Sequence, residues 1–289
     1  MNDRSTDVAS FEAVAARAVR ASGDYLAAAF RGESVEAEYG TDDVKSAADR
    51  TAEERAMAVI REAYPEHAVH GEESGRDGEH RYEWVVDPLD GTNNFAADIP
   101  LFASAACVLE AGEPLVSAIY EPLPDSLYLA RRGGGATIDG EPLAAENGRS
   151  LTHGTVSFVI GLPALRDEAY RSIAGQMEAA LEDRCKRVIE TWSPCVDWGL
   201  LARGSIEGLV AYRPDIYEQY AGALLAEESG VVSRVFDLDG EGTGLNGDDT
   251  GLVEQEASTA GVGIDGLYVA ATNRETCDRL VDAAAVALD

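Results

Sequence analysis

Apolar residues recur at helical spacing near the N-terminus, at Phe11, Val14, Ala15 and Ala18 of the alanine-rich stretch 7–31. This pattern predicts a long first helix that buries one side. Further along, Thr51 followed by Glu54 matches a capping box, which predicts that a second helix starts there and runs to about Ala63.

Short apolar runs separated by turn residues follow, and they predict strands at 67–70, 82–86, 103–110 and 114–120 and a hairpin over 126–138. Later the pattern alternates, with strands predicted at 155–160, 186–190, 206–212 and 267–270 and helices at 167–182, 194–203, 216–229 and 273–288. This order predicts sheets and helices packed in layers, with a division into lobes 1–148 and 149–289 of a single fold. The stretch 237–265, rich in Gly, Asp and Glu, is interpreted as an exposed acidic insertion.

The net charge of the chain says more about its partners and its surroundings than the overall composition does. The 289 residues include 53 acidic and 23 basic side chains, which gives a formal net charge of −30, while the apolar share of 45% is ordinary. Such a surface repels nucleic acid and anionic lipid, so neither is an expected partner. Only two of the basic residues, Lys45 and Lys186, are lysines. We interpret the chain as adapted to high salt, where counterions screen repulsion; a merely acidic protein of ordinary salt is the alternative.

Three other features of the sequence argue against a membrane-spanning protein, a secreted protein and a zinc protein. The longest run without a charged residue, 150–165, is interrupted by Pro163 and is too short to span a membrane. Asp3 and Asp7 stand where a secretory signal carries basic and then apolar residues, which predicts a cytoplasmic protein. The four cysteines lie far apart without a CxxC pair, so buried free thiols are expected rather than a zinc site.

The segment from Trp84 to Phe95 carries the clearest chemistry. Its sequence WVVDPLDGTNNF takes an apolar strand into Asp87 and Asp90, with Pro88 restricting the turn between them. Gly91 permits close backbone approach, and Thr92 can begin a helix with free amides. Carboxylates beside an anion pocket are compatible only if cations lie between them, and Mg²⁺ has the matching preference for oxygen ligands. The alternative is an acidic turn that caps a helix.

Three further acidic segments are ambiguous alone. Glu72, in Gly-Glu-Glu after the predicted strand 67–70, is by itself better explained as part of a solvated surface pair. Asp49 can be interpreted as an acidic residue that only begins a helix. Glu218 precedes Ala221-Gly222 at another predicted helix start, and by itself it does not indicate a metal ligand over a surface residue.

Together these motifs resemble the inositol monophosphatase superfamily of Mg²⁺-dependent, lithium-sensitive phosphatases. The segment DPLDGT with Asn94-Phe95 is the most specific match, and the order of the acidic segments fits over nearly the whole chain. The resemblance implies a layered α/β/α/β/α fold of the sugar phosphatase type. It also implies a metal- and phosphate-binding first lobe and a second lobe that contributes Glu218 on the substrate side.

The resemblance also implies roles for residues. Two or three Mg²⁺ ions would be held by Glu72, Asp87, the Leu89 carbonyl, Asp90 and Glu218. Gly91 and Thr92 would bind the phosphate, and Asp49 with Thr92 would orient and deprotonate the attacking water.

The chain departs from the usual family pattern in two segments. Tyr217-Glu218 stands where Trp-Asp is usual, and Asp215 is a rival metal ligand that would require a shifted helix start. Trp192-Ser193-Pro194-Cys195 replaces the frequent Gly-Ser-Ala-Ala and would reshape the substrate wall.

Two candidate substrate contacts follow from nearby positions. Arg213 could clamp a second phosphate or be an arginine paired on the surface. Asp197 could contact a substrate hydroxyl or cap the helix on which it lies.

The sequence thus predicts a metal-dependent phosphomonoester hydrolase acting on a small polyol, sugar or nucleotide phosphate. Fructose-1,6-bisphosphatase and 3′-phosphoadenosine 5′-phosphate phosphatase activities are alternatives, and a catalytically silent phospholigand-binding protein of the same fold is the rival from another class. Relatives are commonly dimers, so a homodimer is a further expectation.

Overall fold

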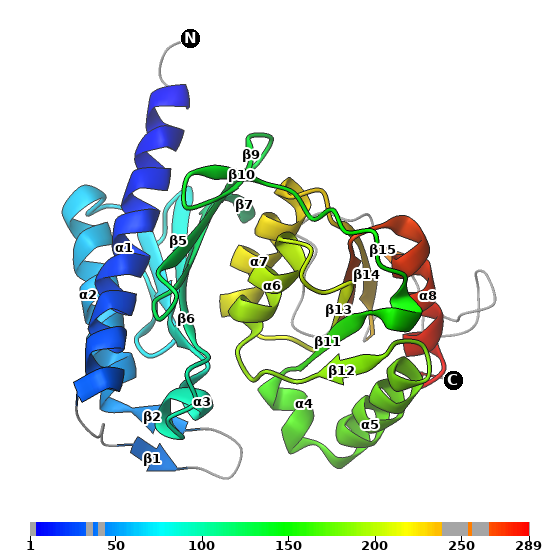
Figure 1. Ribbon diagram of the computed structural model, residues 1–289. Coiled ribbons are helices and arrows are strands. Elements are labelled where there is room, and N and C mark those ends of the chain that lie inside the picture. Colours follow the sequence, from blue (N-terminus) through cyan, green and yellow to red (C-terminus); the bar gives the residue numbers. More distant parts are fainter. Residues whose placement is uncertain (1–3, 33–36, 40–43, 239–253, 256–265, 289) are drawn as a thin grey trace.

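The computed structural model describes residues 4–32, 37–39, 44–238, 254–255 and 266–288 (Figure 1). Its helices are α1 (Arg4–Gly32), α2 (Ala47–Ala63), α3 (Thr92–Ala96), α4 (Leu162–Arg166), α5 (Glu168–Glu182), α6 (Pro194–Ala202), α7 (Ile216–Glu228) and α8 (Arg274–Ala285). A 3₁₀ turn covers Leu151–His153.

Most of the predicted acidic insertion at 237–265 lies outside the described residues. Within the described ranges, no helix combines the length and apolar character needed to cross a bilayer.

The first large sheet has the strand order β10-β9-β8-β7-β6-β5-β3-β4. Its strands are β3 (Ala68–Gly71), β4 (Gly75–Asp77), β5 (Tyr82–Asp90), β6 (Ala103–Glu110), β7 (Glu113–Glu121), β8 (Ser126–Arg131), β9 (Gly135–Ile138) and β10 (Glu141–Leu143). Neighbouring strands are antiparallel except β3 and β5, which run parallel. A separate small hairpin pairs β1 (Ala37–Tyr39) with β2 (Val44–Ser46).

The second sheet has the order β12-β11-β13-β16-β14-β15. Its strands are β11 (Thr155–Ile160), β12 (Arg187–Ile189), β13 (Gly208–Tyr212), β14 (Val232–Asp237), β15 (Glu254–Gln255) and β16 (Gly266–Ala271). Strand β11 runs parallel to both β12 and β13, and the other pairs are antiparallel.

Helices pack on the apolar faces of the two sheets, and this packing produces the layers. Helices α1 and α2 cover the outer face of the first sheet, α6 and α7 lie between the two sheets, and α5 and α8 cover the outer face of the second (Figure 1). The apolar side of α1, with Phe11, Val14 and Ala18 all buried, packs on the first sheet as predicted. Alternating helices and two-faced sheets therefore form the predicted α/β/α/β/α layers, while the lobe boundary at 148/149 stays a prediction.

The predicted start of the second helix was wrong. Helix α2 begins at Ala47, and the Thr51 hydroxyl donates to the Ala47 carbonyl at 3.1 Å from inside the helix. Ala48 and Ala52 are fully buried, so their packing and the high helix propensity of alanine extend α2 by a turn.

Strand β5 also runs further than predicted. It continues past Val86 to Asp90, with a register shift between Asp87, which faces Ala105, and Asp90, which faces Ala103. Pro88 has no N–H to donate to a sheet, so an irregularity here costs no hydrogen bond. The Pro88 carbonyl instead accepts from the hydroxyls of Ser22 and Ser104.

Candidate active site

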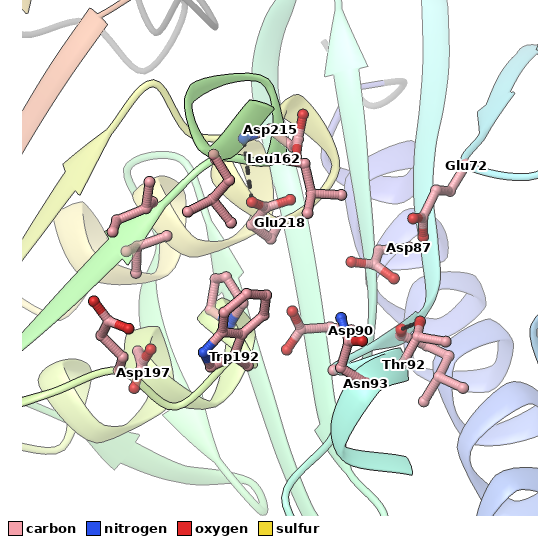
Figure 2. A pocket seen from close by; sticks show the side chains of 18 of the residues that line it. Glu72, Asp87, Asp90, Thr92, Asn93, Leu162, Trp192, Asp197, Asp215 and Glu218 are labelled. Atoms are coloured by element: carbon pink, nitrogen blue, oxygen red, sulfur yellow. Dashed lines mark hydrogen bonds between the residues drawn. The ribbon is translucent and has the colours of Figure 1, made fainter. Parts of the chain in front are cut away.

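The bulge in β5 presents two carboxylates to the same pocket. Asp87 and Asp90 are each only 4% exposed, and both are lining residues of this pocket (Figure 2). A β-bulge re-aims side chains where a regular strand would alternate them. The residues that follow continue the lining, since Gly91 and Thr92 both reach the pocket.

Glu72 enters the pocket from the turn between β3 and β4. The buried carboxylate of Glu53, on α2, holds this turn because it accepts from the backbone N–H groups of Glu73 (2.9 Å) and Ser74 (3.0 Å). Gly71 leaves space for this carboxylate, since a Cβ there would displace the ends of the Glu53 and Met57 side chains. Figure 2 shows the Glu72 side chain pointing toward Asp87.

Glu218 reaches the pocket from the first turn of α7. Its Oε1 accepts from the backbone N–H of Asp215 at 3.2 Å, so α7 starts with Asp215 as its N-cap and no shift of the helix. Asp215 lines the same pocket, but Glu218 and not Asp215 is among the charges that raise the pKa of Asp87. This electrostatic interaction favours Glu218 over Asp215 as the acid that acts on Asp87.

Burial and mutual repulsion shift the titration of these acids. Burial, with the charges of Glu72, Asp90 and Glu218, raises the pKa of Asp87 well above its ordinary value. Burial and the charges of Asp215 and Asp90 do the same for the pKa of Glu218, and burial raises the pKa of Asp90 to about 7. One oxygen of Asp87, Oδ1, is buried without a hydrogen-bond partner. A cluster of this kind fits a hard divalent cation, which satisfies unpaired carboxylate oxygens and offsets their repulsion.

Ser193 and Cys195, which the sequence analysis assigned only to the substrate wall, hold Asp90 in place. Asp90 Oδ2 accepts from the Ser193 hydroxyl at 2.5 Å and from the Cys195 N–H at 3.0 Å. The Cys195 Sγ lies with single oxygens of Asp87 and Asp90 in a group whose members are within 4.8 Å of one another. The four cysteines are free thiols, and three of them, including Cys195, are buried as predicted while Cys185 is half-buried.

Asp49 and Thr92 meet at the edge of the pocket. Thr92 Oγ1 lies 2.9 Å from Asp49 Oδ1 and 3.0 Å from the Leu89 carbonyl, so its single proton is shared between two acceptors. Asp49 lies in the first turn of α2 and is 3% exposed. Gly91 has a φ of 90°, and a Cβ there would press on the Leu101 carbonyl and the Ser193 side chain. Glycine is therefore required at the position that brings Thr92 to Asp49.

The two predicted substrate contacts lie in different surroundings. Asp197 lines the pocket, accepts from the Thr191 hydroxyl at 2.7 Å, and has its pKa raised to about 8 by burial. Arg213 is 5% exposed and is not among the lining residues; its guanidinium carbon lies 4.0 Å from the centre of the Tyr170 ring. The structure thus brings Asp197, but not Arg213, into the described pocket.

The raised pKa values predict how metal-free protein responds to pH. A carboxyl whose folded-state pKa is above its unfolded value of about 4 favours folding at low pH and loses that contribution as the pH rises. For Asp90 and Asp197 the loss extends through pH values of about 7 and 8. His67 acts oppositely at lower pH, because burial and His80 lower its pKa to about 4.

We therefore expect the melting temperature in chelator to fall by at least about 2–4 °C between pH values of about 6.5 and about 8, at constant salt. Excess Mg²⁺ should reduce this fall, because a bound cation favours the ionised carboxylates. A melting temperature that rises across the range would contradict the predicted repulsion.

Comparisons with known proteins agree with the motifs and the layers. The model of the inositol monophosphatase family matches residues 7–276. A curated relative, the fructose-1,6-bisphosphatase/inositol-1-monophosphatase of Aquifex aeolicus, is 33% identical over 215 residues, which cover 74% of this chain and 79% of that protein. The Nus factor SuhB of Escherichia coli is also 33% identical, over 229 residues that cover 77% and 84% of the two chains. Among solved structures, the inositol monophosphatase of Anabaena shares the fold with a TM-score of 0.74 at 23% identity, covering 96% of each chain.

Proposed function

This chain belongs to the inositol monophosphatase family and is a phosphatase of that type, and from this premise we propose that it is a Mg²⁺-dependent phosphomonoester hydrolase acting on a small alcohol phosphate. The observation that carries the proposal is the convergence of Glu72, Asp87, Asp90 and Glu218 on one pocket, with a buried Asp87 oxygen left without a partner. The bisphosphatase alternative has less support, because Arg213 does not line the described pocket.

The proposed division of roles follows the placement of the side chains. Glu72, Asp87, the Leu89 carbonyl, Asp90 and Glu218 would hold two or three Mg²⁺ ions. When bound, such ions make water more acidic and neutralise charge on the leaving oxygen.

The protein itself would position the phosphate and move one proton. Gly91 and Thr92 would bind the phosphate oxygens at the end of β5. When Thr92 Oγ1 donates to Asp49, its lone pairs are free to accept a proton from an attacking water. Asp49 would then take the Thr92 proton, so the pair acts as the general base.

The direct test is phosphate release. Purified protein in about 2 M KCl, where surface charges are screened, should release phosphate from an alcohol phosphate when Mg²⁺ is added and lose this activity with chelator or Li⁺. Folded protein that releases phosphate from no member of a panel of phosphate esters would instead favour the catalytically silent binding protein. Several relatives with a non-enzymatic name make that control worthwhile, since they are called Nus factor SuhB.

The charge of −30 supports a further part of the proposal, namely an enzyme that works in concentrated salt. We propose the cytoplasm as its location. Repulsion between surface carboxylates reaches about 30 Å at 0.01 M salt and about 3 Å at 1 M. Dilution from molar to about 0.01 M salt should therefore unfold the protein, as followed by circular dichroism. Full retention of structure would refute the salt adaptation. A homodimer is proposed as well, and light scattering in the same salt tests it.

A further inference from the structure

One half of the pocket is apolar, in contrast to the half with the carboxylates. Strand β11 and helix α4 supply most of this wall, and the segment before α6 supplies the rest. The apolar wall consists of Phe158, Val159, Ile160, Leu162, Leu165 and Trp192. Figure 2 shows Leu162 and Trp192 on the other side of the pocket from Glu72. A phosphate held beside the carboxylates would therefore direct its alcohol portion toward this wall.

The charged residues on the apolar side of the pocket limit which alcohols can bind there. No lysine, arginine or histidine lines the pocket in the part of the chain that the structure describes. Glu190 and Asp197 lie on this side, and both are acids. A second phosphate or a carboxylate on the alcohol would find no cationic partner among these lining residues and would lie unpaired beside Glu190. The lining therefore fits an alcohol without negative charge.

Trp192 has two unusual features for a large aromatic residue. It is 46% exposed and has a φ of 57°, a left-handed conformation that bulky residues rarely adopt. The other large apolar side chains exposed in the described ranges, Ile99 and Val286, do not line the pocket. Strained backbone of this kind concentrates at ligand-binding positions, and an exposed indole offers a flat surface for stacking.

We propose that Trp192 is a stacking surface for the leaving alcohol, and that the substrates of this phosphatase are monophosphates of uncharged alcohols that carry an aromatic or heteroaromatic ring. The proposal rests on the proposed function, because the phosphate must lie at the carboxylate end for the ring to reach Trp192. Leu162 and Leu165, which are partly exposed on α4, would cover the remaining apolar surface of the ring.

Stacking of this kind acts on substrate and transition state alike. It should lower KM and leave kcat nearly unchanged, because the ring is remote from the bond that breaks. Stacking on an aromatic side chain is worth about tenfold or more in affinity.

The experiment compares 2-phenylethyl phosphate with glycerol 2-phosphate, two alcohol phosphates of which only the first has a ring. In Trp192→Gly, kcat/KM for the first should fall about tenfold or more through KM, while that for the second changes less than about twofold. Glycine suits a φ of 57°, so this variant should melt no lower than the wild type. Trp192→Phe should keep most of the preference, and Val286→Ala, on an exposed site away from the pocket, should keep all of it.

Fluorescence gives a readout that does not need turnover. The chain has three tryptophans, and Trp84 and Trp198 are 0% and 1% exposed, so acrylamide should quench mainly Trp192. We expect 2-phenylethyl phosphate, but not glycerol 2-phosphate, to protect against quenching.

The outcomes separate the two proposals. Equal effects of Trp192→Gly on both substrates, or equal protection by both, would overturn the stacking surface while leaving the phosphatase intact. If neither of these esters nor any other member of the panel is hydrolysed, the proposed function fails, and absence of protection by the phenyl ester would then overturn the stacking surface as well.

Discussion

Replacement of Asp87 by asparagine should abolish phosphate release and at the same time stabilise the metal-free protein. Burial and the charges of three neighbouring carboxylates, Glu72, Asp90 and Glu218, raise the pKa of Asp87. An asparagine keeps the shape but removes the charge that would attract a cation. Loss of groups that only orient metal ligands already costs about 10- to 100-fold, so loss of the ligand itself should exceed about 100-fold in kcat/KM.

The stability effect has the opposite sign. Without metal, the Asp87 carboxylate repels its neighbours in a buried setting, and each pK unit of that repulsion is worth about 1.4 kcal/mol. Asp87→Asn should therefore raise the unfolding free energy in chelator at a pH of about 8 by at least about 1 kcal/mol. Added Mg²⁺ should raise the melting temperature of the wild type more than that of the variant.

A matched control is Asp282→Asn on the exposed side of α8. It removes the same charge from the surface and should leave activity and the response to Mg²⁺ unchanged. An active Asp87→Asn enzyme, or one destabilised in chelator, would show that Asp87 does not belong to a cation-binding cluster.

Gly222→Ala should be among the most destabilising single-methyl changes in the protein. A Cβ at Gly222, in α7, would overlap the ring of Trp198 in α6. Trp198 is 1% exposed and packs edge-on against Tyr268 with ring centres 5.4 Å apart, so it has no space to retreat. Overpacking of this kind costs about 3 kcal/mol, which corresponds to a fall of about 6–12 °C in melting temperature.

The same change should weaken the site, because Glu218 lies one turn earlier on α7. The stabilisation by Mg²⁺ should shrink along with the melting temperature. Gly175→Ala is the control: Gly175 is an exposed residue inside α5 with nothing near its Cβ position, so alanine should stabilise by about 1 kcal/mol. Equal melting temperatures for the two alanine variants would refute the tight contact between α6 and α7.

The sequence was most informative where chemistry is local. DPLDGT places Asp87, Asp90 and Thr92 within six residues, so one strand and one turn are enough to bring them together. Their neighbours were harder to foresee. Ser193 and Cys195 contact Asp90 across more than a hundred residues of chain, and no periodicity encodes such a contact.

The limits of some helices and strands, and the backbone conformation of single residues, could not be predicted from the sequence pattern. The helix does not start at the capping box of Thr51, because Ala48 and Ala52 pack in the core and extend it. Burial of this helix end stabilises the helix more than a local cap, which contributes about 1 kcal/mol. Strand β14 was missed, because its charged and polar residues interrupt the apolar alternation and β16 supplies the pairing that makes it a strand. Trp192 was recognised as a change to the substrate wall, but its left-handed backbone depends on the loop around it.

The wide spacing of the acids has a consequence for biosynthesis. Glu72 and Glu218 are separated by about half of the chain, and α7 packs between the two sheets. A nascent polypeptide therefore cannot complete the proposed cation-binding cluster until α7 has left the ribosome. Before then Glu72, Asp87 and Asp90 lack Glu218, so ion binding should follow the synthesis of most of the chain.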